Sequence, residues 1–286
     1  VLDGRTTDLV GAGRQPRQHL GDRHVRVRRE VLALHEQRPQ RLVGALETAV
    51  GLVTPTTDVV KLAPDVYIRT APLMVAAPTV LSGHGAILRS MLGNLQVMIA
   101  ITGVEATVIG IQTEGTTQVN VSCDGGKVRL HRTRFLGGAI GAYGQCEFVV
   151  ERATVSNQTY YAFSMTNGPI SIANSYLTRN GGSTTIGGVY LFNVTGGAIE
   201  HTTIADNLTN NGNGSFGGLR CMNSPTVVIR NSVVFGNEAP SIQATCTVSS
   251  SVIDPGYTGP GVNNALIDPM FVSPLTNDYH LAPGSP

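Results

Sequence analysis

Three residues of this chain carry side chains suited to acid–base chemistry and stand at matching positions of a recurring phrase. They are His131, Glu151 and Glu200. On neighbouring strands, the His131 imidazole and the Glu151 carboxylate could act as an acid/base pair. Glu151 and Glu200 would lie two strands apart, about 10 Å between backbones, and flexible side chains could bring the carboxyls into the ~6.5–9.5 Å range of inverting glycosidases. These three residues form the predicted catalytic set.

Cationic and aromatic side chains accompany the catalytic set. Arg132 or Arg152 could hold the carboxylate of a uronic acid in a charge-assisted hydrogen bond. The predicted substrate-contacting residues are Arg132, Arg134, Arg152, Tyr176 and Arg230. A structural interpretation competes with this one. Charges alternate on the outside of any repeat protein and keep it soluble, and pairs of opposite sign on neighbouring strands add only small stability.

The phrase itself repeats along most of the chain. It reads as an apolar-x-apolar strand, a small polar pair, another apolar residue and an Asn-rich corner, most clearly at 170–180, 198–207 and 227–237. The second apolar residue of each copy forms a ladder of Ala106, Leu130, Val150, Ile172, Ile199, Ile229 and Val248. The steps are 24, 20, 22, 27, 30 and 19 residues. Repeats of this length predict a solenoid in which each unit buries its apolar face against its neighbours.

The repeats also predict which residues share a surface. Strand side chains alternate, so the residue after each ladder position points outward. This outward column lists Thr107, His131, Glu151, Ala173, Glu200, Arg230 and Ser249. Beyond the bend at the polar pair, a second column lists Arg134, Thr154, Tyr176, Thr203 and Val233. One face would thus gather the histidine, two glutamates, several arginines and a tyrosine.

Composition agrees with many short strands and tight turns. The 286 residues include 34 glycines, few aromatic residues and no tryptophan, and glycine supplies positive backbone angles in turns at low steric cost. Only 14% of residues are charged and the net charge is +1, which gives no electrostatic case for nucleic acid or an anionic membrane. No run of eighteen apolar residues exists, so we expect no membrane span.

Three regions follow from the pattern. Residues 1–40 contain eight arginines against five acids and lack a sustained period. A disordered tail, a linker or an out-of-frame translation is favoured there over a basic nucleic-acid arm. Residues 41–255 would form the solenoid, opened by a short capping helix at 41–53. Residues 256–286 are proline-rich and predict a terminal cap or tail. Without an initial Met or a hydrophobic signal core, the chain is expected to be a fragment.

Four cysteines form two pairs at about one repeat spacing. Cys123 and Cys146 are 23 residues apart, and Cys221 and Cys246 are 25 apart, so each pair could lie on adjacent turns at a separation that suits a disulfide. Metal binding is disfavoured because no C-x-x-C or histidine cluster occurs. Disulfides Cys123–Cys146 and Cys221–Cys246 in an oxidising compartment are predicted, with buried free thiols as the alternative.

Both ends of the repeat region resemble a known family. The stretch from Arg41 to Tyr67, with its strand ending Leu-Ala-Pro-Asp-Val-Tyr, resembles the entry of bacterial right-handed parallel β-helix repeat proteins. The closing Asp-Pro-Met-Phe-Val and Asp-Tyr-His-Leu-Ala-Pro-Gly-Ser-Pro are similar to the ending of the same group, which normally continues for a few residues. The group belongs to the pectate-lyase-like superfamily, which includes polysaccharide lyases, glycosidases, epimerases, phage tailspikes and adhesins. The resemblance implies the fold and glycans as the usual ligands.

Other motifs favour structural roles. Gly83-His-Gly85 is similar to a polygalacturonase motif, but the partner carboxylates of that motif are missing, so His84 is predicted to be a turn residue. Calcium could bind, yet Asp124, Asp206 and Glu200 lie in different registers and no ligand cluster is identified, so no cofactor or metal is expected. Two sets of asparagines, Asn174/Asn231 and Asn180/Asn207/Asn237, predict corner ladders in which amides bond to the turns above and below.

The sequence therefore predicts an all-β fold, a single-stranded right-handed parallel β-helix of seven to nine turns with a short N-terminal capping helix. One functional hypothesis is a secreted or bacterial cell-surface protein that binds, and could process, polysaccharide or a cell-surface glycan. An enzyme of this kind would be a polysaccharide lyase or glycoside hydrolase. The alternative is a non-catalytic, adhesin-like surface module. Aromatic side chains available for a sugar site are Tyr160, Tyr161, Tyr176, Tyr190 and Phe192. The oligomeric state does not follow from the sequence.

Overall fold

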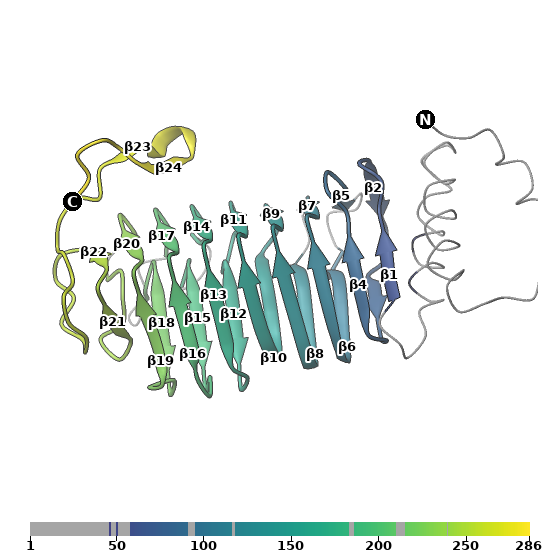
Figure 1. The fold of residues 1–286 in the computed structure, drawn as a ribbon, viewed down its shortest axis with the longest axis horizontal. Coiled ribbons are helices and arrows are strands. Elements are labelled where there is room, and N and C mark those ends of the chain that lie inside the picture. Colours follow the sequence, from purple (N-terminus) through teal and green to yellow (C-terminus); the bar gives the residue numbers. More distant parts are fainter. Residues whose placement is uncertain are drawn as a thin grey trace, which may run out of the picture.

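The computed structural model describes residues 46, 50, 58–90, 95–115, 118–182, 186–209, 215–238 and 240–286. Short strands stack in rows along one long axis (Figure 1). All strand pairs of the two large sheets are parallel, and each turn of the chain contributes one strand to each row. The described residues thus form a parallel β-helix of about eight turns, within the predicted range of seven to nine.

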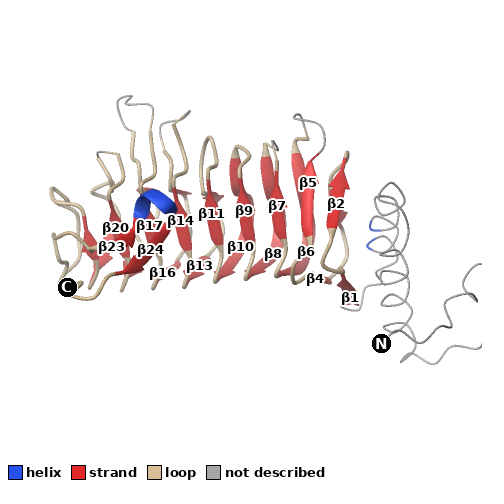
Figure 2. Ribbon diagram, turned by 90° about the horizontal axis from the view of Figure 1, so that it is seen from above, coloured by secondary structure: helices blue, strands red, loops and turns tan. Residues whose placement is uncertain are grey.

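The strands form three faces, seen from a second side in Figure 2. The first face contains β3 (Leu73–Val75), β12 (Phe163–Thr166), β15 (Val189–Phe192), β18 (Leu219–Met222) and the first halves of β6, β8 and β10. The second face contains β1 (Asp58–Lys61), β4 (Thr79–Ser82), β6 (Val97–Ile109), β8 (Val119–His131), β10 (Ile140–Glu151), β13 (Ile170–Ala173), β16 (Gly197–Glu200), β19 (Val227–Arg230) and β21 (Thr247–Ser249). The third face contains β2 (Val66–Arg69), β5 (Ile87–Ser90), β7 (Gln112–Glu114), β9 (Arg134–Leu136), β11 (Thr154–Ser156), β14 (Tyr176–Thr178), β17 (Thr203–Ala205), β20 (Val233–Phe235) and β22 (Val252–Ile253).

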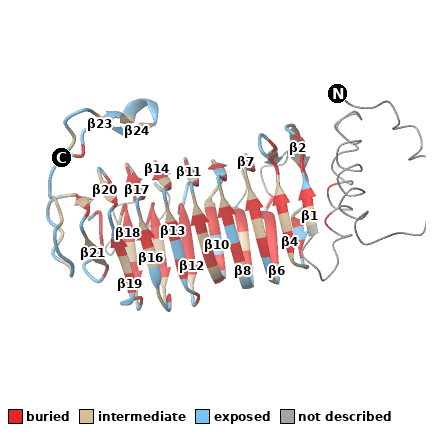
Figure 3. Ribbon diagram, viewed as in Figure 1, coloured by how far each residue is buried: buried red, intermediate tan, exposed pale blue. Residues whose placement is uncertain are grey.

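The core is a set of stacked apolar columns between these faces (Figure 3). The predicted ladder is confirmed from Leu130 onward, because the register pairs its successive members directly: Leu130, Val150, Ile172, Ile199, Ile229 and Val248. All six side chains are buried. Each buried aliphatic side chain contributes about 1.5–3 kcal/mol relative to an exposed one, so this repeated column accounts for much of the stability of the array.

The first step of the predicted ladder is wrong by two residues. Leu130 pairs with Val108, whereas Ala106 pairs with Val128. Ala106 still points inward and is buried, because a shift of two residues leaves a strand side chain on the same face. The outward partner of His131 is accordingly Ile109 and not Thr107.

The predicted amide ladder of Asn180, Asn207 and Asn237 is present inside one corner. The Asn180 Nδ2 donates to the Asn207 Oδ1 at 2.9 Å, and the Asn207 Nδ2 donates to the Asn237 Oδ1 at 2.8 Å. The Gln158 backbone N–H donates to the Asn180 Oδ1 and extends the row. Asn180 and Asn207 are fully buried, so these amides satisfy backbone and side-chain groups that water cannot reach.

The other predicted ladder, Asn174 with Asn231, is not an amide ladder. Along this corner, His201 lies between Asn174 and Asn231 in chain order. All three residues have a positive φ, which is 52° at Asn174, 48° at His201 and 50° at Asn231. Arg132 and Arg152 occupy the same bend with φ of 52° and 56°. Asparagine is enriched at such left-handed positions, which explains it here without side-chain stacking.

Serine and threonine hydroxyls form a third row just after this bend. The Ser232 Oγ accepts from the backbone N–H of Thr202, and the Ser251 Oγ accepts from the backbone N–H of Ser232. Each of these hydroxyls also donates to a carbonyl two residues earlier in its own turn. The small polar pair of the sequence phrase is therefore explained by its buried hydrogen bonds between turns.

The two ends of the chain differ in how far they are described. Of the predicted capping helix at 41–53, Leu46 and Val50 are helical and belong to the buried core. The rest of that helix and the basic segment 1–40 lie outside the described residues, so both remain predictions. After β22 the chain first runs along the last turn, where Ala265 forms a parallel bridge with Val252. It then ends in an antiparallel hairpin of β23 (Phe271–Ser273), the 3-10 helix η2 (Pro274–Thr276) and β24 (Asp278–Leu281).

The structure joins Cys123 to Cys146 and Cys221 to Cys246, with Cα–Cα separations of 6.0 and 5.2 Å. Each bridge connects neighbouring turns on the first-face side of the core, and all four sulfur-bearing residues are buried. Cys123 lies opposite Gly144 in register, two residues before its partner Cys146, and the register of β10 shifts between Gln145 and Glu147 at this point.

Replacing Asn207 by Ala should destabilise the protein by about 2–4 kcal/mol, because the Asn180 N–H and Nδ2 would lose their acceptor inside the core. The measurement is urea unfolding followed by circular dichroism. The control is Ser171→Ala on the exposed side of β13, which should change stability by less than about 0.5 kcal/mol. Equal stability of the two variants would show that the ladder contributes nothing.

The protein made in an oxidising compartment should contain no free thiol, and non-reducing peptide mapping should recover the pairs Cys123–Cys146 and Cys221–Cys246. Each bridge closes a loop of 23 or 25 residues. Reduction should therefore lower the free energy of unfolding by about 3–4 kcal/mol per bridge on the chain-entropy model. Four alkylatable thiols in such native protein would contradict the pairing.

Candidate functional site

The predicted catalytic residues lie in one outward row of the second face. This polar column consists of Ile109, His131, Glu151, Ala173, Glu200, Arg230 and Ser249, paired in register turn by turn. The His131 Nδ1 lies 3.2 Å from the Glu151 Oε2. The column thus brings His131 and Glu151 together as expected from the repeat.

The two glutamates are held in opposite directions along this column. Glu151 bonds to His131 on the preceding turn, whereas Glu200 forms an ion pair with Arg230 on the following turn. Ala173 lies between them, and the Arg152 Nε is 3.6 Å from the other oxygen of Glu151. Because each carboxylate turns away from the space that they would share, the geometry does not support a glycosidase pair of an acid and a base.

The same pattern of pairs occurs elsewhere on the surface. Arg89 lies opposite Glu114 with a 2.6 Å ion pair, Lys127 pairs with Glu147, and the Arg129 Nε lies 3.2 Å from the Glu105 Oε1. Hydrogen bonding to Arg89 is the main reason that the pKa of Glu114 is lowered. These pairs are partly exposed, and such pairs typically contribute about 0–1 kcal/mol. The pairs of the polar column therefore resemble the general cross-turn pattern, which favours the structural interpretation.

The predicted substrate-contacting residues do not gather on one face. Arg230 lies on the second face, Arg132 and Arg152 occupy the bend, and Arg134 and Tyr176 lie on the third face. The second predicted column is found in register, from Arg134 through Thr154 to Tyr176, Thr203 and Val233. However, the C-terminal hairpin approaches Tyr176, whose ring centroid lies 6.1 Å from that of His280.

The hairpin is fixed to the third face by polar contacts. The Tyr279 hydroxyl donates to the Asp206 Oδ2 at 2.7 Å, and an Arg179 Nη donates to the carbonyl of Pro274. Figures 1 and 2 both place β23 and β24 beside β14 and β17. Burial raises the pKa of Tyr279 to about 12, and the hydrogen bond and negative charge of Asp206 act in the same direction.

Aromatic side chains gather instead on the first face. Tyr190 and Phe192 point outward from β15, with ring centroids 6.3 Å apart, and Tyr161 lies 6.0 Å from Tyr190. Tyr160 adjoins Tyr161 at 6.4 Å and is 40% exposed. We call Tyr160, Tyr161, Tyr190 and Phe192 the aromatic surface. It contains four of the five aromatic residues available for a sugar site, and the fifth, Tyr176, lies on another face.

One cation adjoins the aromatic surface. Arg220 is the in-register neighbour of Tyr190 on β18, and its guanidinium carbon lies 5.7 Å from the centre of the Tyr190 ring. A cation within about 6 Å of an aromatic ring centre is attracted by the quadrupole of the ring. Tyr190 and Arg220 are 30 positions apart, the same step as from Ile199 to Ile229, but the prediction from sequence followed only the columns next to the ladder and therefore missed Arg220. Only the alternation Val189-Tyr-Leu-Phe and Leu219-Arg-Cys-Met signals that both point outward.

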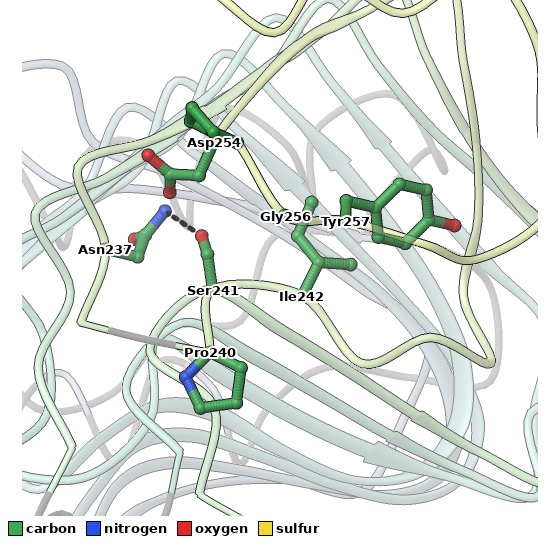
Figure 4. A pocket seen from close by; sticks show the side chains of 8 residues that line it. Asn237, Pro240, Ser241, Ile242, Asp254, Gly256 and Tyr257 are labelled. Carbon is green, nitrogen blue, oxygen red and sulfur yellow. Dashed lines mark hydrogen bonds between the residues drawn. The ribbon is translucent and has the colours of Figure 1, made fainter.

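A pocket lies beside the last turns of the array (Figure 4). Its lining consists of Asn237, Pro240, Ser241, Ile242, Asp254, Pro255, Gly256 and Tyr257. The Asn237 Nδ2 donates to the Ser241 Oγ and to a backbone carbonyl, so its amide belongs to the corner ladder. The Asp254 Oδ2 is buried and has no hydrogen-bond partner among the described residues, and a single carboxylate oxygen is too small a set to bind a cation.

Metal-ligating residues do not cluster in the described ranges, where no group of three His, Cys, Asp or Glu side chains converges. Of the candidate calcium ligands, Glu200 pairs with Arg230 and Asp206 accepts from Tyr279. Within the same ranges, no helix is long and apolar enough to cross a membrane.

Comparisons with known proteins agree with this architecture. A family model described as "Right handed beta helix region" matches residues 110–262. Among solved structures, the chain is similar to the Dettilon tailspike protein (gp208), with 12% identity and a TM-score of 0.51. The similarity covers 79% of this chain and 56% of the tailspike chain, so the chain spans little more than half of that protein. At this identity the likeness shows the fold alone. No curated protein sequence matches the chain.

Replacing Tyr279 by Phe should remove part of the alkaline sensitivity of folding. The folded-state pKa of about 12 exceeds the unfolded value of about 10. The Tyr279 hydroxyl therefore makes its full contribution to the free energy of unfolding below pH ~10. This contribution decreases by about 2–3 kcal/mol as the pH rises through 12. Urea unfolding at a series of pH values should show a smaller alkaline loss in Tyr279→Phe than in wild type. Tyr143→Phe, at an exposed tyrosine, is the control, and identical curves for wild type and Tyr279→Phe would contradict the assignment.

Proposed function

The chain belongs to the right-handed β-helix family, and on this basis we propose that it is a secreted or cell-surface protein that binds polysaccharide through the aromatic surface. The observation that carries the proposal is the continuous set of rings from Tyr160 to Phe192, with neighbouring centroids 6.0–6.4 Å apart. The two disulfides support an extracellular setting, because such bridges persist in oxidising compartments.

Aromatic rings suit sugars for a physical reason. One side of a pyranose ring presents C–H bonds, and the face of an aromatic ring carries the negative side of its quadrupole. Tyrosine also retains a hydroxyl that can hydrogen-bond to sugar hydroxyls. Exposed tyrosines on a soluble protein are otherwise scattered singly, so a row of adjacent rings is better explained by a ligand.

The rigid backbone supports binding of an extended chain. Tyr190 and Phe192 are fixed by a strand whose intervening residues, Val189 and Leu191, are buried in the core. Tyr161 is partly buried, and burial raises its pKa. A site that is ordered before binding loses less conformational entropy when the ligand arrives.

Binding without catalysis is favoured by the second face. In the polar column, Glu151 contacts His131 on the preceding turn and Glu200 forms an ion pair with Arg230 on the following turn. This observation supports the second candidate, a non-catalytic adhesin-like module whose solenoid presents the aromatic surface. A polysaccharide lyase or glycoside hydrolase that uses His131, Glu151 and Glu200 stays a prediction, and we would then expect turnover to depend on Glu151.

The test is a glycan array followed by titration of the best polysaccharide against wild type and Tyr190→Ala. Loss of the central ring should weaken binding about 10-fold or more, the equivalent of roughly 1.4 kcal/mol, which stacked rings can supply. Glu200→Gln on the second face is the matched control and should bind as wild type does. Absorbance of unsaturated products should stay at background in a lyase assay on the same polymers.

The opposite pattern would contradict the proposal. If Glu200→Gln loses binding and Tyr190→Ala does not, the polar column is the glycan site. If wild-type protein binds no glycan on the array, the aromatic surface has another role.

A further inference from the structure

The cation beside the aromatic surface has no acidic partner. The Arg220 guanidinium carbon lies 5.7 Å from the centre of the Tyr190 ring and 5.9 Å from that of Phe216. Two aromatic residues from different parts of the chain therefore contact the same guanidinium. Within the part of the chain that the structure describes, Arg220 forms no ion pair, whereas Arg89, Arg129 and Arg230 each face a glutamate.

Part of this guanidinium is also removed from water. The Arg220 Nε is buried and has no hydrogen-bond acceptor among the described residues. A buried donor without a partner costs about 1–3 kcal/mol, and more when it is charged. Such an arrangement needs a compensating interaction, and the ring contacts supply only about 0.5–2 kcal/mol each. An anion that binds to the terminal nitrogens of the guanidinium, which are not among the buried atoms, would supply the missing counter-charge.

The surroundings place this charge where it can act on a bound sugar. Arg220 pairs in register with Tyr190, and its charge opposes the effect of burial on the pKa of Tyr161. On the first face, the Tyr190 ring thus adjoins both the Tyr161 ring and the Arg220 guanidinium. A sugar ring that packs on Tyr190 would have its substituents within reach of Arg220.

We propose that Arg220 binds the negatively charged group of an acidic sugar residue whose ring packs on Tyr190 and Tyr161. The inference rests on the proposed function and adds the ligand class, an anionic polysaccharide. A guanidinium offers parallel N–H donors that match the two oxygens of a carboxylate, and it binds a sulfate group in the same way. The shared chemistry is a negatively charged group on the glycan that presents two acceptor oxygens side by side.

The experiment compares polymers that differ in charge and not in backbone. Polygalacturonate is paired with its fully methyl-esterified form, and dextran sulfate is paired with dextran. Isothermal titration at an ionic strength of about 0.15 M, where exposed charges are largely screened beyond ~8 Å, is carried out on wild type, Arg220→Gln and Arg220→Lys. Arg129→Gln, on the exposed side of β8 in the second face, is the control, and thermal melts verify that each variant folds.

Wild-type protein should bind one acidic polymer at least about 10-fold more tightly than its neutral partner, a difference of roughly 1.4 kcal/mol. Arg220→Gln should abolish this preference and leave weak neutral binding unchanged, while Arg129→Gln should keep it. Partial rescue by Arg220→Lys is expected, because lysine restores the charge without the fork. Preference for polygalacturonate would identify a carboxylate, and preference for dextran sulfate would identify a sulfate.

Two outcomes would overturn the inference and separate it from the proposed function. If neutral and acidic polymers bind equally, and Tyr190→Ala but not Arg220→Gln weakens both, the aromatic surface binds glycans without selecting charge. If Arg129→Gln reduces binding as much as Arg220→Gln, attraction is a general effect of surface charge. Absence of binding to every polymer, together with an empty glycan array, would overturn both proposals.

Discussion

The parallel register between successive turns is the constraint on which this molecule depends. Each strand pairs with the equivalent strand one turn later, so residues far apart in sequence become neighbours about 4.8 Å apart. Leu130, Val150 and Ile172 share one buried column for this reason, and the next residue of each turn shares one exposed column. A one-residue slip in any turn would exchange buried and exposed side chains. Apolar columns and the asparagine ladder both oppose such a slip.

Those features that repeat in every turn were predictable from the sequence. The inward ladder, the outward columns and the amide ladder of Asn207 each recur at the same point of the phrase, and the structure contains them. The misplacement of Ala106 has a physical origin, because a period of two makes positions 106 and 108 equivalent in burial. The left-handed bend was harder to infer, since arginine, asparagine, histidine and serine all occupy it.

Features that depend on loop length could not be derived in the same way. The aromatic surface combines rings from a loop and from β15, and its cation comes from β18. Tyr190 and Arg220 share the 30-residue step of Ile199 and Ile229, but the 29 residues from Tyr161 to Tyr190 match no step of the ladder, because the loop that carries Tyr161 has no fixed period. Conversely, His131 and Glu151 stand out in the sequence because they lie at equal phase, which is also where any solenoid places pairs of opposite charge. The regular spacing of His131 and Glu151 thus indicated the polar column, whose pairs have a structural role, and not the aromatic surface.

Irregularity of the repeat is itself informative about function. The two longest steps of the ladder are those from Ile172 to Ile199 and from Ile199 to Ile229, of 27 and 30 residues. The extra residues precede β15 and β18, the two strands that carry Tyr190 and Arg220. In repeat proteins, insertions in individual units map to loops on one face, which is often the binding face. The core requires only that each turn return to the same register, so longer loops at this corner cost little conformational entropy. These loops allow the first face to differ from the other two.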